Sequence, residues 1–218
     1  MRVNTLVRTV AVATAAIAAG TFALAGTAQA SGTPTVRTVL RPVTATGHAA
    51  QGYTVRKQLK YSVDCSFTET SPAAVDRDIV LCAPDAAYAV ACWKGAAAHT
   101  VLCFQDARKK QLVEYRAKTV AQTRPYRIKA PLDLRLVDGT YCTIRIGGAG
   151  GTLKQHPRWI AYYYCTGGKT VWASMNDKHW GVHRANPVWT VNIAGSGRNA
   201  KVHQRAVKQA WFVGTVGV

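Results

Sequence analysis

The feature that most constrains this chain is its set of six cysteines, all of which follow an N-terminal segment with the pattern of a secretion signal. The segment starts with two arginines, continues with an alanine-rich apolar stretch over residues 9–26, and ends with the small-residue motif Ala28-Gln29-Ala30. This order of basic, apolar and small residues is typical of a cleavable signal peptide. We therefore expect residues 1–30 to be a signal peptide that is cleaved after Ala30. The mature chain is then secreted, and is extracellular or associated with the cell wall.

An even number of cysteines in an exported chain predicts disulfides. Each cysteine is close along the chain to one other, across a short polar or glycine-containing connection, which favours sequential pairing. Each bridge should then stabilise the folded protein by roughly 3 kcal/mol, because it reduces the conformational entropy of the unfolded chain. A zinc site is disfavoured because no Cys-x-x-Cys or Cys-His pair has ligand spacing, and we expect neither a metal nor a cofactor. The predicted bridges are Cys65–Cys82, Cys92–Cys103 and Cys142–Cys165.

Short apolar runs alternate with turn residues along the mature chain, which is typical of a mainly β protein. We predict antiparallel sheets of the meander or sandwich kind, in two β halves cross-linked by disulfides, after a helical signal peptide. Residues 31–51 are rich in Thr, Pro, Ala and Gly and are expected to be a mobile arm or a loosely attached edge segment. Expected strands are 61–67, 79–82, 88–93, 100–104, 111–116, 132–136, 140–146, 159–165, 170–174, 188–192 and 207–213.

Residues 119–131 are expected to connect the first half, 52–118, to the second, 132–218. Two prolines, Pro125 and Pro131, disfavour helix at the residues before them. Residues 132–136 alternate apolar and charged side chains, so one face should pack on a core and the other, including Asp133, should meet water. Asp138-Gly139 then predicts a hairpin turn.

Charge is distributed unevenly along the chain. The formal charge of +18 becomes +16 without the two arginines of the signal; residues 31–106 carry a net +1, and residues 107–218 carry +15. Such an excess attracts polyanions, with a strength that falls as salt rises, although it could also serve only to keep an exported protein soluble. The candidate contacts for an anionic partner are Lys154, Arg158, Lys169, Lys178, Arg184, Arg198, Lys201, Arg205 and Lys208.

Aromatic residues crowd into the same basic half. We expect most of the tryptophans to pack in the core, because large rings pack well between sheets. Any ring that stays exposed beside a cation could stack on sugars or bases. The residues in question are Trp159, Tyr162, Tyr163, Tyr164, Trp172, Trp180, Trp189 and Trp211.

Several short sequence runs in the second half of the chain resemble those of a known group of proteins. The runs are residues 138–148 (DGTYCTIRIGG), 156–159 (HPRW), 162–165 (YYYC), 187–191 (PVWTV) and 210–215 (AWFVGT). In these runs the chain resembles a group of uncharacterised secreted proteins of high-GC Gram-positive bacteria, an actinobacterial exported group without established activity. The likeness covers roughly the last ninety residues well and residues 65–103 more loosely. It implies export, paired cysteines and a β-rich body, and it implies no catalytic residue.

Motifs that could support catalysis are weak. The glycine-rich run 147–151 lacks the spacing of a dinucleotide or phosphate loop, and His179 and His183 lack the helix, glutamate and third ligand of a zinc protease. The carboxylates of Asp76 and Asp78 flank Arg77 in a predicted turn. His156, beside a proline and ahead of a tryptophan, is the one weak candidate for a catalytic residue.

Three hypotheses about function follow. The first is a secreted protein without enzyme activity whose basic second half binds an anionic polymer: a cell-wall polymer, nucleic acid or an acidic protein. The second is an inhibitor or interaction module that presents residues 147–156 to an extracellular protein. The third, an envelope hydrolase, is disfavoured because no nucleophile or acid pair is evident. No segment of the mature chain is apolar for long enough to cross a membrane.

Overall fold

The computed structural model describes residues 32–67, 69–147, 151–195, 197 and 199–218. These residues form a mainly β protein with antiparallel sheets, as predicted, and contain no α-helix. The signal segment and its cleavage after Ala30 lie outside the described residues. The strands are β1 (Val36–Thr44), β2 (Thr54–Ser62), β3 (Ala91–Lys94), β4 (Thr100–Phe104), β5 (Gln111–Arg116), β6 (Asp133–Leu136), β7 (Tyr141–Ile144), β8 (Trp159–Cys165), β9 (Lys169–Ser174), β10 (Val182–His183), β11 (Trp189–Gly195) and β12 (His203–Val216), with 3-10 turns η1 (Asp85–Ala87) and η2 (Thr166–Gly168).

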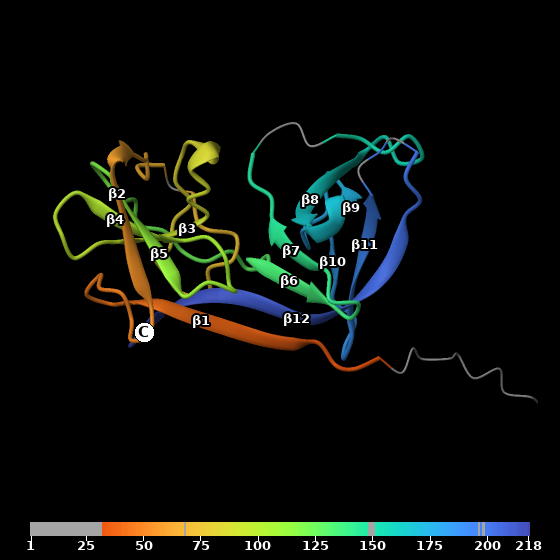
Figure 1. Cartoon of the computed structure of the whole chain (residues 1–218), viewed down its shortest axis with the longest axis horizontal. Coiled ribbons are helices and arrows are strands. Elements are labelled where there is room, and N and C mark those ends of the chain that lie inside the picture. The colour runs from red at the N-terminus through yellow and green to blue at the C-terminus, as the bar shows by residue number, and fades with distance from the viewer. Residues whose placement is uncertain (1–31, 68, 148–150, 196, 198) are drawn as a thin grey trace, which may run out of the picture. The chain divides into compact units, whose positions relative to one another are not determined.

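The second half of the chain closes into a barrel. Its sheet has the order β1-β12-β6-β7-β8-β9-β11-β10, and β11 also pairs with β12, so that six strands form a ring (Figure 1). Closure is possible because β12 is 14 residues long. Its residues 203–207 pair with β11, residues 207–211 pair with β6, and residues 209–216 pair with β1. A closed ring leaves few unpaired strand edges.

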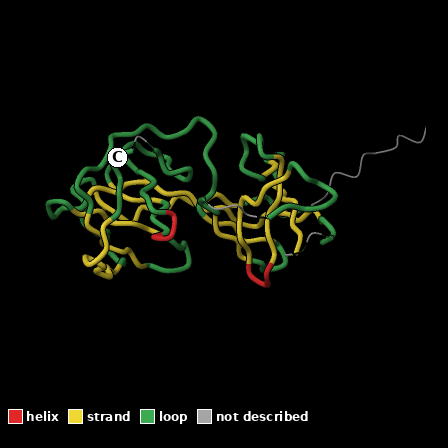
Figure 2. The backbone as a smooth tube through the Cα atoms, turned by 90° about the horizontal axis from the view of Figure 1, so that it is seen from above, coloured by secondary structure: helices red, strands yellow, loops and turns green. Residues whose placement is uncertain are grey.

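The first half forms a separate four-stranded sheet of order β2-β5-β4-β3. Strands β3, β4 and β5 make an antiparallel meander, and β2 lies at the far edge, parallel to β5. Figure 2 shows the strands of the barrel and of this sheet as two groups. The segment between β5 and β6, which includes residues 119–131, has no regular strand.

The two halves share one hydrophobic core although they do not share a sheet. A single cluster of buried side chains contains Leu102 and Phe104 from β4 together with Leu134 and Tyr163 from the barrel. Polar contacts also join the halves: the Trp93 indole N–H donates to Thr215 Oγ1 at 2.9 Å. The halves therefore fold as one packed body.

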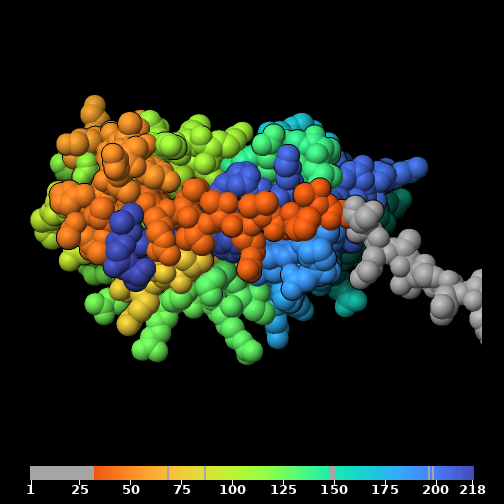
Figure 3. Space-filling model, turned by 90° about the horizontal axis from the view of Figure 1, so that it is seen from below, coloured from red at the N-terminus to blue at the C-terminus, as the bar shows by residue number. Residues whose placement is uncertain are grey.

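Of the two alternatives predicted for residues 31–51, the mobile arm is wrong for Val36–Thr44, whereas an edge segment is what the structure shows. This segment is the edge strand β1, which runs parallel to β12, with a register shift between Leu40 and Val43 beside Pro42. Figure 3 shows the N-terminal part of the described chain lying along the molecule. The partner of β1 is the last strand, so no local sequence signal marks the pairing, and the Thr, Arg and Pro residues give it the composition of a linker.

All three disulfides have the predicted sequential pairing. Cys92 faces Cys103 across β3 and β4, and Cys142 faces Cys165 across β7 and β8. The third bridge, Cys65–Cys82, joins two irregular segments, where the predicted strands 61–67 and 79–82 are wrong because these residues make only isolated bridges after β2 ends. Three disulfides point to an extracellular or other oxidising environment.

The carboxylates that the sequence placed in turns have structural roles. Asp138 accepts a hydrogen bond from the Thr140 backbone N–H in the predicted hairpin turn. Asp76 pairs with Arg41 at 2.7 Å, and Asp78 accepts from the Thr123 backbone N–H. The prediction that Asp133 is exposed to water is wrong, because its side chain is fully buried in β6.

Candidate functional site

A cationic groove of about 440 Å³ lies beside Trp189. We call it the tryptophan groove. Four of the side chains that line it are basic, and none of the described residues that line it is acidic. Its lining residues are Arg37, Val39, Val75, Arg127, Lys129, Arg184, Trp189 and Phe212.

Segments that are far apart in the sequence build this groove. Arg37 comes from β1, Arg127 and Lys129 from the connector before β6, and Arg184 follows β10 directly. Trp189 is buried at the start of β11. The parallel pairing of β1 with β12 is what brings the N-terminal arginine to the barrel.

The aromatic floor of the groove orients its arginines. The Arg184 guanidinium carbon lies 4.9 Å from the centre of the Trp189 ring, and that of Arg37 lies 5.9 Å from it. Phe212 in turn packs edge-on against Trp189, with ring centres 6.4 Å apart. Cation–π contacts of this kind fix the direction of a guanidinium without neutralising its charge.

Arg184 is the most constrained cation of the groove. It donates a hydrogen bond to the backbone carbonyl of Lys129, which ties the connector to the barrel. Burial lowers the pKa of Arg184, yet an arginine side chain stays protonated at neutral pH. Its buried Nε–H has no hydrogen-bond partner among the described residues. The groove therefore holds a positive charge that is partly removed from water, which strengthens its attraction for an anion.

A second cationic site, which we call the lysine pocket, is formed where β9, β11 and β12 meet. Its volume is about 320 Å³. Three residues of the predicted set, Lys169, Lys201 and Arg205, line it together with His203. The remaining lining residues are Gly167, Ile193, Ala194 and Gly195.

The lysine pocket is partly neutralised by an acidic neighbour. Lys169 Nζ lies 3.8 Å from Asp138 Oδ2 and 3.4 Å from Thr140 Oγ1. The hydrogen bond from Thr140 lowers the pKa of Asp138, and the charges of Lys169 and Arg205 lower it further, so this carboxylate is ionised at neutral pH. Among the described lining residues, the tryptophan groove thus has four basic side chains and no carboxylate, whereas Lys169 of the lysine pocket lies beside an ionised carboxylate.

The nine predicted contacts do not all line one site. Lys169, Lys201 and Arg205 meet in the lysine pocket, while Arg184 lines the tryptophan groove. Arg198 lies outside the described residues. The other four are exposed: Lys154, Arg158 and Lys178 in loops, and Lys208 on β12.

Sequence reasoning missed Arg37, Arg127 and Lys129. They lie in the segments interpreted as an arm and a connector, and Arg37 falls outside the strongly basic half. The only signal in the sequence is that both segments carry basic residues without nearby carboxylates. That signal does not indicate that the two segments meet.

The weak catalytic candidate and the histidine pair have no arrangement that suggests chemistry. The His156 ring stacks on Trp159 with centres 4.0 Å apart. His183 lies in β10 beside the Asn192 amide, and His179 is exposed. The described residues contain no group of three or more His, Cys, Asp or Glu side chains placed to hold a metal ion. Residues 148–150 of the glycine-rich run lie outside the described part of the chain.

Comparison of the chain with protein-family models, with curated proteins and with solved structures finds no match. In the part of the chain that the structure describes, no helix is long and apolar enough to span a membrane.

Proposed function

We propose that this protein is a secreted, non-catalytic binding protein for an anionic polymer of the cell envelope or its surroundings. The observation that carries the proposal is the tryptophan groove, in which Arg37 and Arg184 lie over the Trp189 ring. Arg127 and Lys129 line the same groove, and none of its described lining residues is a carboxylate. A phosphate or carboxylate group fits there because guanidinium groups donate paired hydrogen bonds to planar and tetrahedral oxyanions. The lysine pocket supplies a second contact for an extended chain of charges.

The two sites also predict how the affinity should respond to salt. A polyanion releases condensed counterions when cations bind its charged groups, so the affinity falls as a power of the salt concentration. Each cation that is removed from the site should reduce the slope of that dependence by about 1. A protein that uses its charge only for solubility has no such site-specific slope.

The test uses the double variant Arg37→Glu/Arg127→Glu, because both side chains are exposed and the substitutions spare the buried floor of the groove. Binding to isolated Gram-positive cell wall and to duplex DNA is measured at increasing sodium chloride. We expect the variant to bind the preferred polymer at least about tenfold more weakly at low salt, with a shallower salt slope. Lys201→Glu/Arg205→Glu tests the lysine pocket in the same way, with a smaller expected loss.

The matched control is Lys60→Glu/Arg116→Glu, which changes the net charge by the same amount at exposed positions of the four-stranded sheet. It should retain most of the affinity. An equal loss in the control and the groove variant would mean that only net charge matters. Binding that is absent, or that does not change with salt, would also contradict the proposal.

A further inference from the structure

A third cavity lies beside β2 and differs in chemistry from the two cationic sites. Its volume is about 540 Å³, within the range of roughly 300–1,000 Å³ that is usual for small-molecule sites. We call it the tyrosine pocket. It shares no lining residue with the tryptophan groove or the lysine pocket. It is lined by Arg56, Gln58, Tyr61, Ser62, Val63, Pro84, Ala87, Tyr88, Gln105 and Tyr115.

An irregularity in β2 opens this pocket. Lys57 pairs with Glu114 and Ser62 pairs with Arg116, so β2 advances five residues while β5 advances two. The residues between therefore leave the regular ladder, as in a large β-bulge. Bulges redirect side chains and are frequent next to functional sites. Here the bulge contains Gln58 and Tyr61, both of which line the pocket.

Three tyrosines frame the pocket at different depths. Tyr115 is 4% exposed and forms part of its floor, Tyr88 is half-buried, and Tyr61 is 66% exposed. An exposed tyrosine ring contributes little hydrophobic free energy to folding. Because the Tyr61 ring lies beside the cavity, it can cover the apolar face of a ligand.

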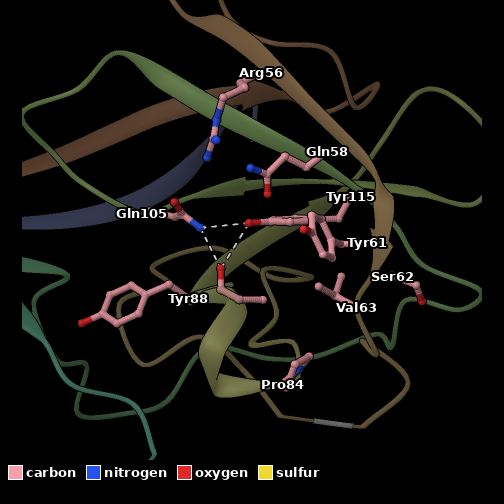
Figure 4. A pocket seen from close by; sticks show the side chains of 10 residues that line it. Arg56, Gln58, Tyr61, Ser62, Val63, Pro84, Tyr88, Gln105 and Tyr115 are labelled. Atoms are coloured by element: carbon pink, nitrogen blue, oxygen red, sulfur yellow. Dashed lines mark hydrogen bonds between the residues drawn. The ribbon is translucent and has the colours of Figure 1, made fainter.

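Two polar side chains of the pocket, Gln105 and Tyr115, are held in place before any ligand binds. Gln105 Nε2 donates to the Ala87 carbonyl at 2.9 Å and to Tyr115 Oη at 3.3 Å, and Tyr115 Oη donates to the same carbonyl at 3.2 Å. Figure 4 shows this hydrogen-bonded set and, beside it, the side chains of Gln58 and Arg56. Preorganised polar groups lower the cost of ordering a site on binding.

From this combination we infer that the tyrosine pocket binds a saccharide, one or two pyranose units of a glycan. A pyranose has an apolar C–H face that stacks on an aromatic ring and a rim of hydroxyls that both donate and accept hydrogen bonds. Tyr61 supplies the ring, while amide and guanidinium groups of Gln58 and Arg56 supply partners for hydroxyls. No described lining residue is acidic, and Arg56 is the single charged side chain among them. One cation is too few for a polyphosphate and repels a quaternary ammonium ligand.

The inference does not depend on the proposed anion binding. If both hold, the protein would contact a glycan through one half and its anionic substituents through the other. If the groove proposal fails, the tyrosine pocket can still bind a neutral sugar.

The test is isothermal titration calorimetry of the oxidised mature protein with defined saccharides. The probes are chitotetraose, cellotetraose and the N-acetylglucosamine–N-acetylmuramic acid disaccharide. We expect at least one probe to bind, and Tyr61→Ala to weaken that binding by at least about tenfold, since a stacked ring contributes a comparable amount in other aromatic platforms. Tyr61→Trp keeps a ring at the same position and should retain binding.

The matched control is Tyr126→Ala, which removes another exposed tyrosine that does not line the pocket. It should bind the saccharide as the parent protein does. The inference is overturned if no probe binds, or if the alanine variants at positions 61 and 126 behave alike. The circular dichroism spectrum and the Tm of Tyr61→Ala should match those of the parent protein, which shows that the variant is folded whether or not the protein binds polyanions.

Discussion

Replacing Asp133 with asparagine is expected to raise the free energy of unfolding by about 3 kcal/mol at pH 7 and to leave it nearly unchanged at pH 3. The reason is that Asp133 is fully buried at the contact between the two halves of the protein. Its Oδ2 accepts a hydrogen bond from the Ala107 backbone N–H at 2.6 Å, whereas its buried Oδ1 has no hydrogen-bond partner among the described residues.

Burial raises the pKa of Asp133 from 3.8 to about 6, and the nearby charge of Asp106 adds to the rise, although the Ala107 N–H and the nearby hydroxyl groups of Tyr141 and Thr143 oppose it. Arg108 and Lys109, the two basic residues that follow Ala107 in the chain, pair with Asp106 and not with Asp133. A charged carboxylate therefore sits in the core at neutral pH.

The sign of the effect follows from proton binding. Between pH 3.8 and about 6 the unfolded chain has lost this proton while the folded protein keeps it. The contribution of Asp133 to stability therefore falls as the pH rises through this window and stays low above it. Asparagine does not titrate in this range, so the Asp133→Asn variant should not show this decrease in unfolding free energy as the pH rises.

The quantity to measure is the difference in unfolding free energy between variant and parent from pH 3 to pH 8, by urea denaturation. Carboxylates that do not interact with Asp133 titrate too, but their contributions cancel in the difference between variant and parent. Asp138→Asn serves as the control, since the pKa of Asp138 is lowered and its removal should cost stability above that pKa. A difference curve for Asp133→Asn that is flat, or that shows a loss of stability at pH 7, would contradict the buried-charge argument.

Asp133 also illustrates the limit of pattern reading. The alternation of residues 132–136 correctly predicts strand β6 and the exposure of Arg135. The same pattern wrongly predicts that Asp133 is exposed to water. The loop after β4 covers Asp133, and the Ala107 N–H of that loop donates a hydrogen bond to its side chain. A binary pattern describes one strand at a time and carries no information about a covering loop from the other half.

Local signals predicted the strands that pair with sequence neighbours. Strands β4, β5 and β8 have the predicted bounds, and the hairpin turn at Asp138-Gly139 is present. Long-range pairings were not predictable in this way. The parallel contacts of β1 with β12 and of β2 with β5 join segments separated by long stretches of chain.

The candidate sites depend on those long-range pairings. Arg184 was identified from the charge excess, but the groove around it exists because β1 brings Arg37 beside Trp189. Likewise, the tyrosine pocket exists because β2 loses register against β5. Composition indicated an anionic partner, whereas the shapes of the sites come from pairings that the sequence did not reveal.

Removing the Cys142–Cys165 bridge, by alanine at both positions, is expected to lower the unfolding free energy by about 3 kcal/mol and the Tm by roughly 6–12 °C. The two cysteines are 23 residues apart in sequence and face each other across β7 and β8. Without the bridge, the unfolded chain gains the freedom of that loop, while the hydrogen bonds between the strands remain in the folded barrel. Thermal unfolding followed by circular dichroism measures the shift.

The Cys92–Cys103 bridge provides the comparison, because it also joins facing strand residues but spans only 11 residues. Halving the loop should reduce the entropic part of the effect by about 0.6 kcal/mol. Binding to the tryptophan groove should survive both substitutions below the new Tm, since no cysteine lines the groove. An unchanged Tm for the Cys142→Ala/Cys165→Ala protein would contradict this prediction. It would mean that the bridge does not restrict the unfolded chain, and that the strand hydrogen bonds and the shared core alone stabilise the barrel.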